Sequence, residues 1–217
     1  MLLLHAILAA ESVKPPRAGL RGWPLREVRV GELTGWATHC GEPTFSPGRE
    51  DLLAQHALLQ NALGACVPVR FPTWLADEAA VRELLARRHA GLLAALEHVR
   101  GRVELAVTTT WAAEGLATPV SVIASSPGRR FLEERRRQYA ESDQRRAAAE
   151  RVARLIEADD GVMEARHSLS NLGLSSAVLV RADDALAVAE RLRELREGVR
   201  ILVNGPWPPY SFVSLEG

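Results

Sequence analysis

The chain has 217 residues, of which 47% are hydrophobic and 25% are charged, a composition typical of a globular protein with one large domain or two small ones. Basic and acidic residues are equal in number at 27 each, so no bulk field attracts nucleic acid or an anionic membrane. Two cysteines make no disulfide framework, and no apolar run approaches the ~20 residues that cross a bilayer. We therefore expect a cytosolic protein with no nucleic-acid or membrane partner.

The first half of the chain predicts several strands. Residues 2–9 are apolar on both faces, which is typical of a central strand and not of a signal peptide, because the positive n-region is missing. Alternating residues predict a strand around Val28, and a third strand is expected across 33–40. A short strand is expected at 66–71, and a longer one with a single wet face at 103–111.

Two helices are expected between these strands. A cap followed by proline at 46–47 predicts a helix that Gly64 ends. Its predicted buried stripe comprises Leu52, Leu53, His56, Leu59 and Leu63. A second helix should begin at Asp77 and end at Gly101, with Arg88 as the single polar residue in its apolar face.

A long helix dominates the second half. Residues 112–118 are a candidate linker and 120–124 alternate as a strand. The helix of about 30 residues that follows ends near Asp159 and spans roughly 45 Å. Its middle, 141–146, is polar on every side, so we expect it to be exposed or to lie against a partner.

The remaining elements complete a recognisable order. A strand from Gly161 to His167, a turn at 171–173 and a strand at 177–180 are followed by a helix that opens at 183–184 and by a last strand at 199–203. With the strand at 120–124, this reads β-α-β-β-α-β, the ferredoxin-like pattern.

The chain then ends in an unusual segment. Three prolines among residues 206–209 cannot serve a central strand and favour an extended backbone. This segment carries Trp207, Tyr210 and Phe212, which lose little entropy on docking. Two destinations are open: a groove of the protein itself, at the seam between two domains, or a docking strip for another protein.

The stretch 205–212, Gly-Pro-Trp-Pro-Pro-Tyr-Ser-Phe, resembles the C-terminal signature of the gas vesicle accessory proteins of the GvpF/GvpL family. His56, the run 68–71 and the pair Gly101 and Glu104 add to the resemblance, which spans nearly the whole chain. It implies an α/β (α+β) fold of two modified ferredoxin-like domains, at 1–117 and 118–217, the second with a long helix and the tail 204–217.

No motif predicts chemistry. The histidines and cysteines lack metal-ligand spacing, and no glycine-rich phosphate loop is present. Residues 173–177 do not form a nucleophile elbow, because they precede a strand instead of a helix. We expect no enzyme activity, no catalytic residue, no metal and no cofactor.

The resemblance implies a role at gas vesicles, in which the chain binds the hydrophobic shell protein and supports nucleation and assembly together with other accessory proteins. The alternative from the fold pattern is a nucleic-acid-binding module with paired ferredoxin-like domains. The candidate partner-binding or interdomain residues are Trp207, Tyr210, Phe212, His56, Arg70, Asp143 and Arg146.

Overall fold

The computed structural model describes residues 1–10, 12–41, 46–111, 127–170, 173–195 and 199–213. Its chain divides into two compact units. Unit 1 comprises Met1–Glu104, Arg181–Asp183 and Pro206–Gly217, and unit 2 comprises Leu105–Val180 and Asp184–Gly205. The boundary expected from the sequence, at 117/118, lies outside the described residues. The two compact units are divided differently, because Pro206–Gly217 belongs to unit 1.

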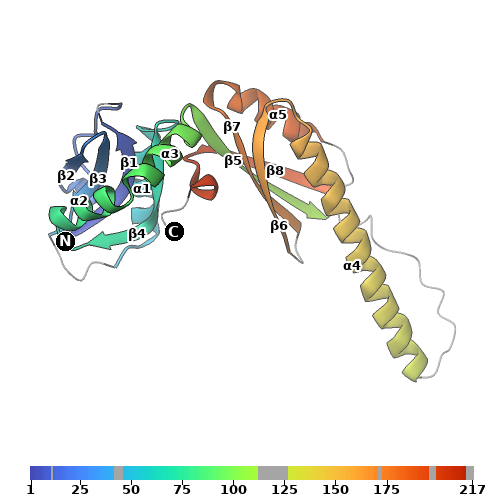
Figure 1. The fold of residues 1–217 in the computed structure, drawn as a ribbon. Coiled ribbons are helices and arrows are strands. Elements are labelled where there is room, and N and C mark those ends of the chain that lie inside the picture. The colour runs from blue at the N-terminus through green and yellow to red at the C-terminus, as the bar shows by residue number, and fades with distance from the viewer. Residues whose placement is uncertain (11, 42–45, 112–126, 171–172, 196–198, 214–217) are drawn as a thin grey trace. The chain divides into compact units, whose positions relative to one another are not determined.

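Unit 1 is built on a four-stranded sheet with the order β2-β3-β1-β4 (Figure 1). The strands are β1 (Leu2–Ala9), β2 (Leu25–Val30), β3 (Leu33–His39) and β4 (Cys66–Leu75). β1 is central and buried along almost its whole length, as its apolar sequence predicts. All three strand pairs are antiparallel.

A bulge in β1 decides which side chains face which helix. Against β3, Leu4 pairs with Ala37 and Ala6 pairs with Trp36, so His5 is the extra residue. Before the bulge Leu4 packs into one core cluster, and after it Ala6 packs into another. The bulge therefore sets His5 into the sheet face that carries Ala6.

Helices cover both faces of this sheet. α1 (Arg49–Gln60) packs on the face of Ala6, through Leu58 and Leu59. α2 (Glu78–Arg87) and α3 (His89–Val99) supply buried residues to the opposite core. The single helix expected from Asp77 to Gly101 is thus two helices, because the backbone breaks at Arg88, the polar residue in the apolar stripe.

The starts of these helices differ in how well the sequence predicted them. Asp77 caps α2 as expected, by accepting a hydrogen bond from the backbone N–H of Ala80 at 2.9 Å. α1, in contrast, begins after Gly48 and not at 46–47. The carboxylate of Asp51 accepts the N–H of Gly48 at 2.8 Å, so a side chain inside the first turn closes this end.

Unit 2 contains the second four-stranded sheet, in the order β6-β7-β5-β8. Its strands are β5 (Arg102–Trp111), β6 (Val162–Ser170), β7 (Gly173–Arg181) and β8 (Val199–Trp207). The sequence interpretation grouped 103–111 with the elements of the first unit; in the structure this strand lies between β7 and β8 in the second sheet. The linker at 112–118, the strand at 120–124 and the turn residues 171–172 lie outside the described residues.

The two sheets share one strand order, second-third-first-fourth along each unit. In unit 2, α4 (Pro127–Glu157) joins the first two strands, and η2 (Ala182–Asp184) with α5 (Ala185–Glu194) joins the last two, which is the ferredoxin-like arrangement. In unit 1 the described part of the segment between the first two strands contains η1 (Leu20–Gly22) in place of the first helix. The α+β fold with modified ferredoxin-like domains is confirmed.

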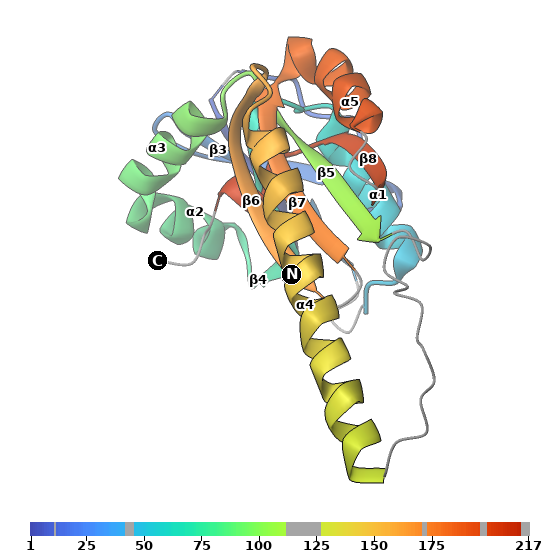
Figure 2. The same cartoon turned by 90° about the vertical axis from the view of Figure 1, so that its right-hand side faces the viewer.

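Among the described side chains of α4, the buried ones lie near its carboxyl end. Ala149, Val152 and Ile156 are buried, whereas the described side chains of 134–148 are exposed or partly exposed. In Figures 1 and 2 the amino-terminal half of α4 runs on beyond the strands of its own sheet. The expected exposure of the polar middle is confirmed for Asp143 and Arg146. Among the described helices, none is long and apolar enough to cross a membrane.

The end of the chain is less extended than its prolines suggest. β8 continues through Pro206 to Trp207, which is possible because β8 is an edge strand and needs no N–H from proline on its open side. The chain then turns into η3 (Tyr210–Phe212), a short 3-10 helix. The turn brings the aromatic residues back onto unit 1.

Candidate partner-binding site

The tail is anchored in unit 1 by its last described residues. Phe212 is only 5% exposed, and Val213 packs against the core cluster that α2 and α3 cover. η3 itself packs against β4. This part of the tail therefore belongs to the interior of unit 1.

A buried carboxylate fixes the same turn. Glu104, 8% exposed at the start of β5, accepts the backbone N–H and the hydroxyl of Ser211, each at 2.8 Å. Hydrogen bonds to a charged acceptor are stronger than those between neutral groups. Removing the carboxylate would take this acceptor away from both donors of Ser211. Glu104 and the tail motif, two parts of the family resemblance, are thus direct partners.

Trp207 lies on α1. Its ring centroid is 4.3 Å from that of His56, and the two planes meet at 57°. The side-chain amide of Gln60 donates to the carbonyl of Pro206 at 3.3 Å and lies 3.1 Å from Nε2 of His56. Partial burial lowers the pKa of His56, so its ring is neutral at pH 7 and Nε2 can accept from Gln60.

Tyr210 is also tied to α1. The residue is 38% exposed, yet burial raises the pKa of its hydroxyl to about 12, so the hydroxyl end is the covered end. That hydroxyl bonds to the side chain of Gln55. Gln55 in turn contacts Nδ1 of His5 in the bulge of β1, which links the tail to the centre of the sheet.

His5 is the centre of a polar network beneath α1. Its Nε2 lies 2.6 Å from Oγ1 of Thr38 on β3, and the same Oγ1 accepts the N–H of Leu20 at 3.0 Å. Burial lowers the pKa of His5 to about 4, although its bond to Gln55 opposes that shift. His5 is therefore neutral at pH 7 and holds η1, β3 and α1 together by hydrogen bonds.

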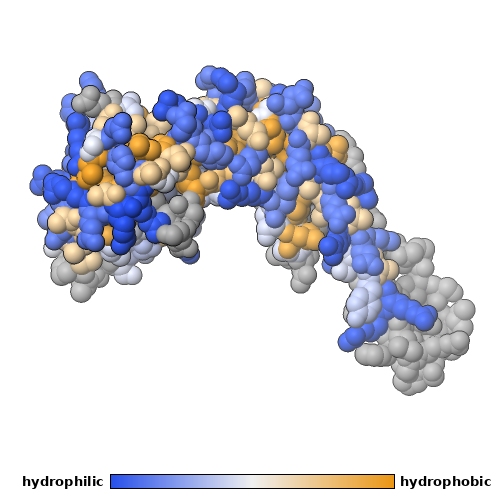
Figure 3. Space-filling model, in the orientation of Figure 1, coloured by the Kyte–Doolittle hydropathy of each residue, from blue (hydrophilic) through white to orange (hydrophobic). Residues whose placement is uncertain are grey.

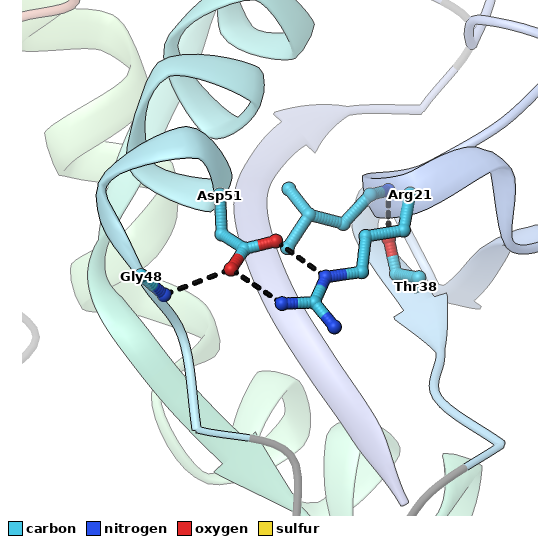
Figure 4. A network of polar contacts seen from close by, with 5 residues as sticks. Arg21, Thr38, Gly48 and Asp51 are labelled. Atoms are coloured by element: carbon cyan, nitrogen blue, oxygen red, sulfur yellow. Dashed lines mark hydrogen bonds and ion pairs between the residues drawn. The ribbon is translucent and has the colours of Figure 1, made fainter.

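A second link joins η1 to the start of α1, as Figure 4 shows. Nε and Nη2 of Arg21 donate to the two carboxylate oxygens of Asp51 at 2.7 and 2.8 Å. The hydrogen bond from Arg21 holds the pKa of Asp51 below its ordinary value. Arg21 adopts a left-handed backbone with φ of 52°, a cost that this bidentate pair helps to offset.

These contacts rotate α1 away from its predicted orientation. Asp51 and Gln55 are 4% and 1% exposed, whereas Leu52 and Leu53 are 54% and 59% exposed. The predicted buried face of α1 was therefore wrong by about one residue, which corresponds to a rotation of roughly 100° about the helix axis. The buried polar groups of β1 and η1 need partners, and α1 supplies them by turning two leucines outward.

The outward leucines and the tail form one surface. Leu52 and Leu53 lie four and three residues before His56, so they neighbour it on the helix, and the tilted ring of Trp207 contacts the ring of His56 from the tail. We call the surface made by Leu52, Leu53, His56 and Trp207 the α1–tail platform. Sequence reasoning picked out two of its members but assigned both leucines to the core.

Other candidates from the sequence lie elsewhere. Arg70 is exposed on β4, where its carbonyl accepts the hydroxyl of Thr73 at 2.6 Å. Phe212 is buried and anchors the tail. Asp143 and Arg146 are exposed on α4 of unit 2, and Arg146 pairs with Glu150 at 3.4 Å.

One arrangement in unit 2 has the residue types of a hydrolase. Nδ1 of His167 lies 2.8 Å from Oγ of Ser176, and Nε2 lies 3.2 Å from a carboxylate oxygen of Glu157. Ser176 is only 4% exposed and pairs with His167 across two strands beneath α4, so the three residues fasten α4 to the sheet. Within the described residues, no three potential metal ligands gather.

The carboxylates at the end of α4 are structural. Asp159 binds Nε and Nη2 of Arg191 on α5 at 2.7 and 2.6 Å and accepts the N–H of Gly161 at 2.9 Å. The hydrogen bond from Arg191 lowers the pKa of Asp159. Asp159 therefore stabilises the turn between α4 and β6.

Comparisons with known proteins agree with this architecture. The chain is similar to the gas vesicle protein GvpF of an Anabaena species, with a TM-score of 0.77 and 18% identity over 97% of this chain and 94% of that one. It is also similar to GvpF of Microcystis aeruginosa, with a TM-score of 0.73 and 12% identity over 97% and 98% of the two chains. At these identities the likeness shows the fold.

Sequence relatives identify the family. The chain is 30% identical to gas vesicle protein F of a Streptomyces species, over 92% of this chain and 93% of the relative. It is also 30% identical to gas vesicle protein L of a Streptomyces species, over 91% and 86% of the two chains. The model of the family described as gas vesicle synthesis protein GvpL/GvpF matches residues 2–214. On this evidence, the chain belongs to the GvpL/GvpF family of gas vesicle proteins.

Proposed function

We propose that this chain is an assembly factor that binds the hydrophobic gas vesicle shell protein and supports its nucleation, at the vesicle and alongside other gas vesicle accessory proteins. The observation that carries the proposal is the α1–tail platform. Leu52 and Leu53 are more than half exposed, and they lie next to the half-buried Trp207. Helices cover both faces of the sheet in this unit, so the platform lies on the outer side of α1. Exposed apolar side chains that gather in one place mark interaction surfaces.

The platform suits a hydrophobic helix or strand as its partner. Two leucines and a tryptophan offer apolar area, and the neutral His56 adds no charge that would lose hydration on contact. The network beneath α1 holds the helix in place, so little further ordering is needed when a partner binds. Trp207 and His56 are the central contacts in this proposal, and Tyr210 lies at its margin.

A pair of matched variants tests the platform. The double change Leu52→Ser and Leu53→Ser should lower capture of co-expressed shell protein about tenfold or more, because the apolar contact area is lost. The control is Leu186→Ser on α5, an equally simple change at a leucine that is 73% exposed in unit 2. Both proteins should keep their melting temperature. Unchanged capture by the double variant would refute the platform as the binding surface.

We also propose that the chain acts without catalysis and without a cofactor. The support is the burial of Ser176 in a paired strand, where its hydroxyl cannot meet a substrate while α4 is in place. Ser176→Ala should therefore leave vesicle formation in cells intact. Loss of vesicle formation with a fully folded Ser176→Ala protein would show that the serine has a chemical role.

A further inference from the structure

The described side chains of α4 in the part beyond its own sheet are exposed or partly exposed. We call residues 134–148 of α4 the overhang; its described side chains include Tyr139, which is 61% exposed. Figure 3 shows the described part of this segment as mostly hydrophilic. Helices gain most of their stability in water from tertiary contacts, so a helical segment whose described side chains are mostly exposed gains little stability from its own unit. A second surface against it would stabilise it.

The charges of the overhang are arranged symmetrically about Tyr139. Arg135 lies four residues before Tyr139 and Asp143 four residues after it, so all three share one stripe of the helix. Each charged residue is displaced from Tyr139 by about 6 Å along the axis. Nη1 of Arg135 donates to the hydroxyl of Tyr139 at 3.3 Å, so these two side chains are in contact along the stripe.

Such a stripe is complementary to itself when reversed. If a second α4 lies antiparallel with its Tyr139 opposite the first, Arg135 of each copy faces Asp143 of the other. The same operation sets Arg136 opposite Ser142, and so brings no like charges together at these described positions. A parallel pairing would instead place each charge opposite its own kind, which is unfavourable.

We propose that the overhang binds a second copy of this chain, with the two α4 helices antiparallel about a two-fold axis at Tyr139. Two exposed ion pairs and a pair of tyrosines make a weak interface that salt screens, so the dimer should be reversible and concentration-dependent. The interface is made by residues of unit 2, and the α1–tail platform is made by residues of unit 1.

Disulfide trapping tests the axis directly. A residue on a two-fold axis meets its own copy, so Tyr139→Cys should form a disulfide-linked dimer under mild oxidation. Gln144→Cys, on the same exposed helix but off the axis, should not, and the native Cys40 and Cys66 are buried. Equal trapping at both positions, or none at 139, would overturn the proposal.

Charge reversal tests the pairing without a covalent bond. In sedimentation equilibrium, Asp143→Arg should raise the dissociation constant of the dimer about tenfold, because both ion pairs become repulsive. Adding Arg135→Asp to the same chain should restore it, since the charges again face their opposites. A chain that is monomeric throughout, or a dimer indifferent to both changes, would contradict the assigned interface.

Discussion

The tail and the overhang of α4 were the two segments that the sequence left without a place in a core, and the structure treats them in opposite ways. The tail turns back at η3 and buries Phe212, and Ser211 donates two hydrogen bonds to the carboxylate of Glu104. The overhang continues away from its sheet with its described side chains exposed. A segment that is rich in aromatic residues is covered by its own unit, and a segment that is rich in charge is not.

The difference extends to the helices that each segment involves. α1, beside the tail, buries Asp51 and Gln55 because Arg21 and His5 require them, and it turns two leucines outward. The overhang exposes Asp143 and Arg146, and no described group requires them to be buried. Polarity alone therefore does not decide which face of a helix is buried; the presence of a buried partner does.

The largest effect should come from the anchor of the tail. Phe212→Ala should destabilise unit 1 by about 3–5 kcal/mol, the usual cost of removing a buried aromatic ring. Leu202→Ala on β8, where the leucine is 57% exposed, is the matched control and should change stability by about 0.5 kcal/mol or less. Urea unfolding followed by tryptophan fluorescence measures both. Equal effects would mean that the tail is not anchored there.

Acid should weaken the region beneath α1 through His5. The folded pKa of His5 is about 4 and its ordinary value is 6.5, so between these values the unfolded chain binds a proton that the folded chain does not. Stability should thus be complete above pH 6.5 and fall on acidification towards pH 4, by about 3 kcal/mol from this group. The test is the slope of unfolding free energy against pH, which His5→Gln should flatten; an unchanged slope would exclude His5 as its source.

A smaller loss is expected from the carboxylate that holds the tail. Glu104→Gln replaces one carboxylate oxygen, which accepts a hydrogen bond from Ser211, with an NH₂ group that can only donate. The change should lower the free energy of unfolding by about 1–3 kcal/mol. Ser211→Ala removes only the hydroxyl bond and should cost less than that. Differential scanning calorimetry of both variants checks the order, and a reversed order would show that the backbone bond contributes little.

The smallest effect should be in the overhang. Asp143→Ala with Arg146→Ala should leave stability within about 0.5 kcal/mol, because both side chains are exposed and the pair of Arg146 with Glu150 is a surface pair. Thermal unfolding at low protein concentration, where dimers are absent, is the appropriate measurement. A loss of several kcal/mol would place the overhang in a packed core and remove the contrast with the tail.

The sequence predicted the local features of the fold well. Alternation located the strands of both sheets, and the all-apolar run at 2–9 identified the central strand β1. It could not assign β5 to the second sheet, because strand pairing is non-local and β5 follows the elements of unit 1 directly. Nor could it end α2 at Arg87, although Arg88 marked the position.

The candidate site was only half predictable. Trp207 and His56 were found through the family resemblance, whereas Leu52 and Leu53 were assigned to the core, because α1 has leucines on two of its faces. The choice between those faces depends on His5, 50 residues away from Gln55 in the chain. The pair Asp51 and Gln55, four residues apart on one face, was the available signal, and a buried histidine in the central strand was the other.

Amide hydrogen exchange of α1 tests most directly whether the tail is a structural part of unit 1. The measurement compares the full chain with a chain that ends at Gly205 and therefore lacks Trp207, Ser211 and Phe212. We predict that the amides of α1 lose protection by at least about tenfold in the shortened chain, since the contacts to His56, Gln60 and Gln55 are gone. Equal protection of α1 in the two chains would contradict this account.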